Sequence, residues 1–133
     1  MLTVVAALIQ SEGKLLVCQR RRNDSFALMW EFPGGKTKPG ESLTQALERE
    51  LQEELGAKAS IGPEIYRTRH RYAELSEPIE LIFFAATLAV NELQNLVFEH
   101  ITWREPSTLH ELNFLPADHE LIEKLATGVL RLP

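Results

Sequence analysis

The chain has 133 residues, of which 44% are hydrophobic and 25% are charged, and its formal net charge is −5. This composition is typical of a folded protein rather than a disordered one, and the length fits a single domain over residues 1–133. The negative charge argues against a nucleic-acid polymer as the partner, because affinity for nucleic acid comes largely from basic surface.

The chain opens with two strand-like runs, residues 2–9 and Lys14–Gln19, which a turn at residues 11–13 joins into a hairpin. The first run is too short to span a bilayer and lacks the basic residues of a signal peptide, so we expect no membrane association. Cys18 is the only cysteine and allows no internal disulfide, which predicts a reducing, cytoplasmic compartment. A short extended segment follows at Trp30–Gly35 and ends in a turn.

The next element is a helix that begins near Ser42 and ends at Leu55. Ser42 and Gln45 have the S-x-x-Q spacing of a capping box, and Gly56 fits the left-handed position that closes a helix. An apolar stripe with a period of 3.6 residues predicts the face that packs inward. Its members are Leu43, Ala46, Leu47, Leu51 and Leu55.

Three further strands and a second helix complete the predicted order. The strands are expected at Glu64–Tyr72, Ile79–Val90 and Leu96–Trp103, and the nearly continuous apolar character of the second favours a central position in a sheet. The helix is expected at about Ala117–Ala126, with Pro116 at its start. Strands interleaved with two helices predict an α/β protein, with a mixed sheet between helical layers.

An acidic cluster lies on the first helix at Glu50, Glu53 and Glu54. Residues three and four apart on a helix are neighbours on its surface, so these carboxylates lie close together. A solvated acidic face is the usual meaning of such a cluster. Hard oxygen donors without an adjacent His or Cys also suit Mg²⁺ or Mn²⁺, and we favour this metal-site interpretation.

The spacing Gly35-x5-Glu41-x7-Arg49-Glu50-Leu51-x-Glu53-Glu54-x-Gly56 resembles the Nudix box, the signature of the Nudix hydrolases. Its one departure is Ala57, where the family prefers a larger aliphatic residue. The segments Trp30–Lys36, Gln19-Arg20 and Leu115–Asp118 resemble the MutT-type branch, so the resemblance covers nearly the whole chain. It implies the Nudix fold, an α/β/α sandwich.

The resemblance also implies a reaction. MutT-type enzymes hydrolyse a nucleoside triphosphate to the monophosphate and pyrophosphate with Mg²⁺, or Mn²⁺, so the expected partner is a small nucleotide. Removal of 8-oxo-dGTP, a role linked to DNA repair, is the leading hypothesis. The alternatives are hydrolysis of CTP or a modified pyrimidine triphosphate, hydrolysis of ADP-ribose or a dinucleotide polyphosphate, and a sensor that binds a nucleotide without cleaving it. Both a monomer and a homodimer are compatible with the sequence.

By the same resemblance, helix carboxylates and one backbone carbonyl hold the metal. These ligands are Glu50, Glu53, Glu54 and the carbonyl of Gly34. Arg49 would orient the acidic group. The group that activates water stays open between Glu53, Glu50 and Glu99. Glu99 enters because the family often places a ligating Glu before a strand Trp, here Trp103, although a plain surface carboxylate is equally compatible.

The resemblance finally implies residues that select the base. Arg20 would face a purine edge or a phosphate, with a solvated arginine as the alternative, and Trp30 or Phe32 would flank the base. Asp118 stands where enzymes specific for oxidised guanine have Asn. An ionised Asp only accepts hydrogen bonds, whereas Asn also donates, and Asp118 could instead simply favour the start of the last helix. A short segment would contact the nucleotide through its backbone: Glu31, Phe32, Pro33 and Gly34.

Overall fold

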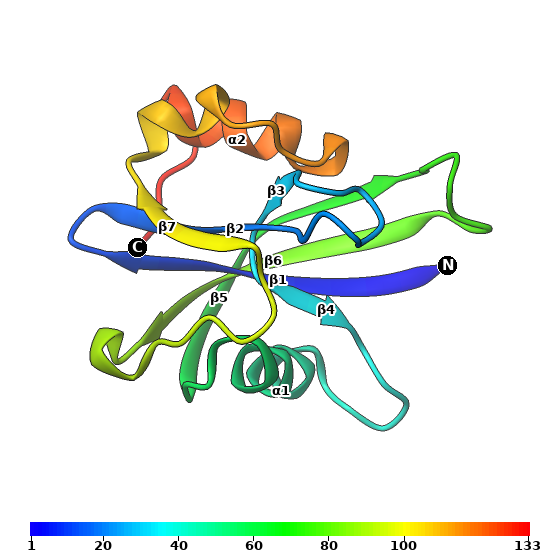
Figure 1. Ribbon diagram of the computed structural model, residues 1–133, viewed down its shortest axis with the longest axis horizontal. Coiled ribbons are helices and arrows are strands. Elements are labelled where there is room, and N and C mark those ends of the chain that lie inside the picture. Colours follow the sequence, from blue (N-terminus) through cyan, green and yellow to red (C-terminus); the bar gives the residue numbers. More distant parts are fainter.

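The fold has three layers, as the computed structural model of residues 1–133 shows (Figure 1). The sheet lies in the middle, helix α1 (Leu43–Leu55) covers one face, and helix α2 (His119–Ala126) covers the other (Figure 1). The predicted α/β/α sandwich is therefore confirmed. Neither helix has the length and apolar character needed to cross a membrane.

Seven strands form one mixed sheet. Strand β1 pairs in parallel with β6 and antiparallel with both β2 and β4, so β1 and β6 form the centre of the sheet. The pairing of β1 with β4 brings the Gly-rich segment beside the middle of the sheet. The strands are β1 (Leu2–Ser11), β2 (Lys14–Gln19), β3 (Trp30–Glu31), β4 (Gly34–Lys36), β5 (Ala59–His70), β6 (Ile79–Leu88) and β7 (His100–Arg104).

Helix α1 forms as predicted because its ends are encoded locally. The Ser42 side chain accepts from the backbone N–H of Gln45, and the Gln45 side chain accepts in return from the backbone of Ser42. Gly56 closes the helix with a φ of 64°. The apolar stripe of α1 packs against β1, β2 and β6, and Ala46, Leu47, Leu51 and Leu55 are fully buried there.

The starts of two strands differ most from the prediction, and the other strand ends differ by at most two residues. Strand β5 begins at Ala59 rather than Glu64, since it pairs only with β6 and an edge strand tolerates Pro63 and the bulges between Ile61 and Tyr66. Strand β7 begins at His100, after a turn that the Asn95 side chain closes by bonding both the N–H and the C=O of Phe98.

The last helix also starts later than predicted. Pro116–Asp118 forms a short 3₁₀ turn, η3, and α2 follows from His119. The other 3₁₀ helices are η1 (Val90–Glu92) and η2 (Pro106–Glu111). Together, η2, η3 and α2 cover a second apolar core that includes Phe32, Phe83 and Phe114. The turn η3 matters for the site because it carries Asp118.

Candidate functional site

The acidic edge of α1 touches the Gly-rich strand β4 through Glu54. Its Oε1 accepts a hydrogen bond from the backbone N–H of Gly34 at 3.0 Å. Burial raises the pKa of Glu54 to about 9, and the negative charges of Glu31, Glu50 and Glu53 add to that effect. Glu54 is therefore a carboxyl group held in place among other carboxyl groups, with only a backbone N–H to offset its charge.

Both glycines of β4 lie in close contacts. Gly34 has a φ of 156°, and a side-chain Cβ there would lie 2.7 Å from the Cα of Ala6. At Gly35, a Cβ would lie 2.6 Å from Oε2 of Glu50. The strand can approach the sheet only because Gly34 lacks a side chain, whereas a side chain at Gly35 would displace the Glu50 carboxylate.

The backbone of Gly34 points away from β1. The carbonyl of Pro33 accepts from the N–H of Ala7 at 2.9 Å, and the N–H of Thr37 donates to Thr3 at 3.1 Å. Hydrogen-bonded pairs alternate in an antiparallel ladder, so the N–H and C=O of Gly34 stay outside the pairing with β1. The carbonyl of Gly34, the predicted metal ligand, is therefore not used in the hydrogen bonds of the sheet.

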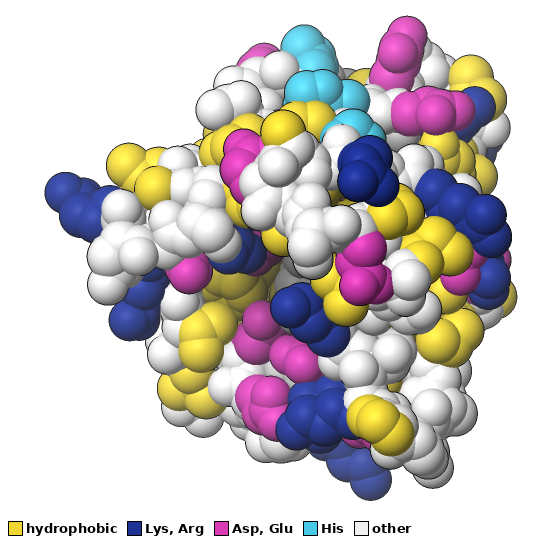
Figure 2. All heavy atoms as spheres, turned by 90° about the vertical axis from the view of Figure 1, so that its right-hand side faces the viewer, with side chains coloured by type: hydrophobic (Ala, Val, Ile, Leu, Met, Phe, Trp, Pro, Cys, Tyr) yellow, Lys and Arg dark blue, Asp and Glu magenta, His cyan; other side chains and the backbone are white.

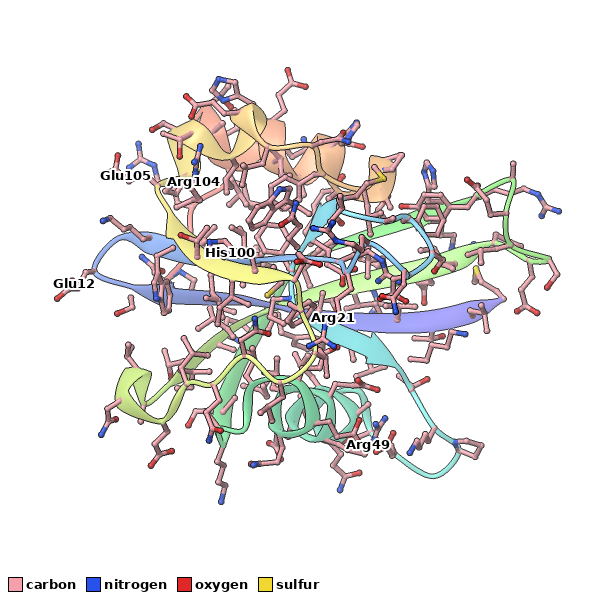
Figure 3. The ribbon with its side chains drawn as sticks, viewed as in Figure 1. Glu12, Arg21, Arg49, His100, Arg104 and Glu105 are labelled. Atoms are coloured by element: carbon pink, nitrogen blue, oxygen red, sulfur yellow. The ribbon has the colours of Figure 1, made fainter.

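Arg49 joins the acidic residues of α1 to the preceding loop, where Figure 3 shows it. Its guanidinium donates to both carboxylate oxygens of Glu41, at 2.6 and 3.0 Å, and to Glu50 at 2.9 Å. Weaker contacts of 3.4 Å reach Glu53, and another bond of 3.1 Å reaches the carbonyl of Lys36. Arg49 therefore fixes the loop and draws Glu50 and Glu53 toward itself.

The donors on this edge fit a divalent cation in kind. They are carboxylates in excess, next to a free backbone carbonyl, and their mutual repulsion would be relieved by a cation. No three His, Cys, Asp or Glu side chains converge closely enough to form a ready-made ion site. Glu50 and Glu53 instead pair with Arg49.

A cavity of about 350 Å³ extends from Glu54 to the far side of the sheet. Six residues predicted for the site line it: Arg20, Glu31, Phe32, Gly34, Glu54 and Asp118. The face in Figure 2 is hollowed near its centre, where acidic side chains lie beside basic ones. A second hollow, of about 630 Å³, lies between η2 and α2 and is lined by none of the predicted residues.

Arg20 is already engaged within this cavity. It donates to both carboxylate oxygens of Glu31, at 3.1 and 3.2 Å, and to the carbonyl and hydroxyl oxygens of Ser25, at 2.7 and 3.2 Å. Burial raises the pKa of Glu31, and the nearby Arg20 lowers it in part. Arg20 thus ties the loop after β2 to β3, a role that the sequence did not indicate.

Asp118 corrects one premise of the sequence argument. It is 3% exposed, and burial, with the nearby charge of Glu31, raises its pKa well above the ordinary value. A raised pKa favours the protonated carboxyl, which can donate one hydrogen bond as well as accept. The expected contrast with Asn assumed an ionised side chain, a form that this shift disfavours.

Six predicted residues lie outside the cavity wall, two of which, Arg49 and Glu50, form the ion pair described above. Pro33 contributes its carbonyl to the sheet, as described above. Glu99 lies just before β7, 3.7 Å from Arg22, and does not line the cavity. Trp30 packs edge-on against His100, with ring centroids 6.1 Å apart, so of the two aromatic residues only Phe32 faces the cavity. Glu53 is half exposed on the outer side of α1.

Among the cavity residues that were not predicted, three come from loops: Phe26, Tyr72 and Leu75. They come from the loops after β2 and β5. The rings of Phe26 and Tyr72 touch at 5.0 Å between centroids. No local spacing marks these residues, because only the tertiary fold brings the two loops together.

The chain is similar to known proteins over its whole length. The family model described as NUDIX domain matches residues 1–126. "CTP pyrophosphohydrolase" of Escherichia coli strain K12 is 40% identical over 128 residues, which cover 92% of this chain and 90% of that protein. "8-oxo-dGTP diphosphatase" of Haemophilus influenzae is 34% identical and covers 92% of this chain and 89% of that protein.

Solved structures agree with these matches. The solution structure of the E. coli ORF135 protein has a TM-score of 0.83 and 35% identity, covering 97% of this chain and 89% of that one. The MutT protein from Methanosarcina mazei Go1 has a TM-score of 0.85 and covers 98% of this chain and 96% of that one. At 23% identity, that second likeness concerns the fold alone.

Proposed function

Since the chain belongs to the NUDIX domain family, we propose that it hydrolyses nucleoside triphosphates to the monophosphate and pyrophosphate with Mg²⁺. The observation that carries this proposal is the continuity of the site. The carboxyl-rich edge of α1 opens directly into a cavity of about 350 Å³, whose other end holds Asp118. A nucleotide placed there has its phosphates at the carboxylates and its base beside Asp118.

The residues of α1 and β4 have distinct roles in this proposal. Glu50, Glu53 and Glu54, with the carbonyl of Gly34, would hold Mg²⁺. The bound ion supplies neutralisation of the phosphate oxygens and lowers the pKa of a coordinated water. Arg49 positions the carboxylates through its contacts with Glu50 and with the loop. Glu53 is the proposed base that removes the proton of the attacking water, and Glu50 and Glu99 are its alternatives.

The base end of the cavity suits a ring that offers both donors and acceptors. A neutral Asp118 can donate to a carbonyl oxygen or ring nitrogen while accepting from an N–H group. The guanine edge, with O6 and N1–H, and the cytosine edge, with N3 and the exocyclic amine, both present this combination. We therefore propose 8-oxo-dGTP as the leading substrate and CTP as the second, since relatives named for each are 34% and 40% identical to this chain.

A substrate panel tests the proposal. The wild-type protein with Mg²⁺ is incubated with 8-oxo-dGTP, dGTP, CTP and 5-methyl-dCTP, and pyrophosphate and orthophosphate are measured separately. We expect pyrophosphate as the phosphorus product, loss of turnover with EDTA, and recovery with added Mg²⁺. Release of orthophosphate alone, or no turnover of any triphosphate, would contradict the proposed reaction. Hydrolysis of ADP-ribose in preference to every triphosphate would move the protein to the alternative activity.

A further inference from the structure

Tyr72 connects two distant parts of the cavity wall. It follows β5, is 7% exposed, and its hydroxyl oxygen accepts a hydrogen bond from the backbone N–H of Ala117 at 2.9 Å. The two residues are 45 positions apart in the chain. The Tyr72 ring is fixed on both sides, by Phe26 at 5.0 Å and by His70 at 4.4 Å between ring centroids.

The partner of Tyr72 is the residue that precedes Asp118. Ala117 is the middle residue of η3, and the N–H of Asp118 is used inside the same turn, donating to Leu115 at 2.9 Å. The Asp118 carboxyl makes no hydrogen bond to another protein group and lines the cavity. The position of that carboxyl is therefore set by the turn, and the turn is held to β5 by Tyr72.

The hydroxyl hydrogen of Tyr72 is left without a protein acceptor. Its oxygen already accepts from Ala117, and no other hydrogen bond of this hydroxyl is present. Burial raises the pKa of Tyr72 to about 12, so the hydroxyl keeps its proton under physiological conditions. A buried donor with no partner costs free energy, whereas a ligand atom in the cavity can accept from it.

We propose that Tyr72 is a specificity-determining residue of the base pocket, which donates its hydroxyl hydrogen to an acceptor on the base and positions Asp118 through Ala117. The inference rests on the proposed function and deepens it by naming two adjacent groups that read one edge of the base. Tyr72 provides a donor only, because Ala117 uses its acceptor side. Asp118 provides the neighbouring donor and acceptor, so a base is read by its pattern of hydrogen-bonding atoms.

Tyr72→Phe removes the hydroxyl and keeps the ring that packs against Phe26 and His70. For the best triphosphate of the panel, we expect KM to rise roughly threefold to tenfold, the worth of one neutral hydrogen bond, with kcat within about twofold. The preference for that base over the others should fall by a similar factor. A deoxyribose triphosphate without a base should be hydrolysed equally by both proteins, because it makes no contact with the hydroxyl.

Tyr66→Phe is the matched control. Tyr66 is the only other tyrosine, and its hydroxyl lies beside Glu120 rather than in the cavity. A change in thermal stability alone, without a change in base preference, is expected of Tyr66→Phe. If Tyr72→Phe and Tyr66→Phe leave base preference equally untouched, the proposal is overturned.

A double variant tests whether Tyr72 and Asp118 act together in recognising the base. The effects of Tyr72→Phe and Asp118→Asn on KM should combine to less than their product, since residues that share one function are not additive. A full product of the two effects would refute the positioning of Asp118 by Tyr72. If Tyr72→Phe folds poorly, Asp118→Ala tests the same pocket, because loss of the carboxyl that Tyr72 positions should lower base preference, and an unchanged preference would overturn the proposal.

Binding of nucleoside monophosphates, measured by calorimetry, separates this inference from the proposed reaction. The monophosphates occupy the base pocket without turnover, so the preference of the wild type and its reduction in Tyr72→Phe are readable even if no triphosphate is cleaved. Turnover with unchanged base preference in Tyr72→Phe would overturn the inference alone. A wild type that binds every monophosphate with equal affinity, or none, would overturn it as well.

Discussion

Asp118→Asn should make the protein more stable at neutral pH, by an amount that grows with pH. Burial raises the pKa of Asp118 in the folded state, while in the unfolded chain it ionises near pH 4, at about 3.9. Above that value the unfolded chain loses its proton and the folded protein keeps it, so the wild type loses stability as pH rises. The loss stops once the pH passes the raised pKa of the folded state.

The size of the effect follows from the linkage. Within that window the wild type should lose about 1.4 kcal/mol of unfolding free energy per pH unit more than the Asn variant, because the raised pKa values of Glu31 and Glu54 act on both proteins alike. For a chain of this size the difference corresponds to roughly 4–6 °C in Tm per pH unit. The ionisable groups around Asp118 are Glu31 on β3, Arg20, which pairs with Glu31, and Tyr72, which is neutral. Both proteins share all three groups.

Thermal unfolding followed by circular dichroism, in EDTA and from about pH 4.5 to about pH 7.5, measures this difference. Only its slope with pH is diagnostic, because a constant offset reflects the change of one side chain for another. Asp24→Asn, at a site that is 52% exposed, controls for the exchange of a carboxyl for an amide. A Tm difference between Asp118→Asn and the wild type that stays flat across the range would show that Asp118 ionises normally in the fold, and the hydrogen-bond donor assigned to it would be lost.

Three further predictions concern the α1–β4 edge. Glu54→Gln should lower kcat at least about hundredfold while the helix content by circular dichroism stays unchanged, because the N–H of Gly34 can still donate to the amide oxygen; a rate above half of the wild type would remove Glu54 from the metal site. Gly34→Ala should cost about 2–4 kcal/mol of unfolding free energy in urea, because the added Cβ would meet Ala6. Gly40→Ala is the control: it has a φ of 85° but faces open space, and should cost about 1 kcal/mol. Equal costs would refute the close approach of Gly34 to β1. Arg49→Lys should lower kcat about tenfold with little change in Tm, because one ammonium group cannot reproduce the paired bonds to Glu41, and an unchanged kcat would argue against a positioning role.

Local signals predicted the parts of the fold that local contacts determine. The capping box at Ser42 and the left-handed Gly56 depend on residues within one turn, and α1 begins and ends where they indicate. The apolar run of β6 predicted a central strand because burial on both faces requires it, and β6 lies between β1 and β5. The fold class and the family followed from such signals.

Features that depend on distant contacts were missed. Asp118 was treated as ionised because its burial, 3% exposed, arises from packing that no local pattern shows. Tyr72 was placed at the end of a strand, but it lies in the loop beyond β5 and bonds a residue 45 positions away. The start of β7 was also placed too early, although the turn before it is local: the Asn95 side chain bonds the backbone groups of Phe98, three residues on.

The two ends of the cavity differ in their origin: one comes from a single contiguous segment and the other from separate loops. One contiguous stretch, from Gly34 to Glu54, supplies the proposed phosphate end, and hydrogen bonds within that stretch hold Glu54 and Arg49. The base end is assembled from separate loops that carry Phe26, Tyr72 and Asp118. Exchanging those loops with ones from a relative should therefore transfer base selectivity while the chemical step continues on an untouched scaffold. In such a molecule, substrate preference changes with the loops at the cavity rim, and the residues proposed for bond cleavage stay the same.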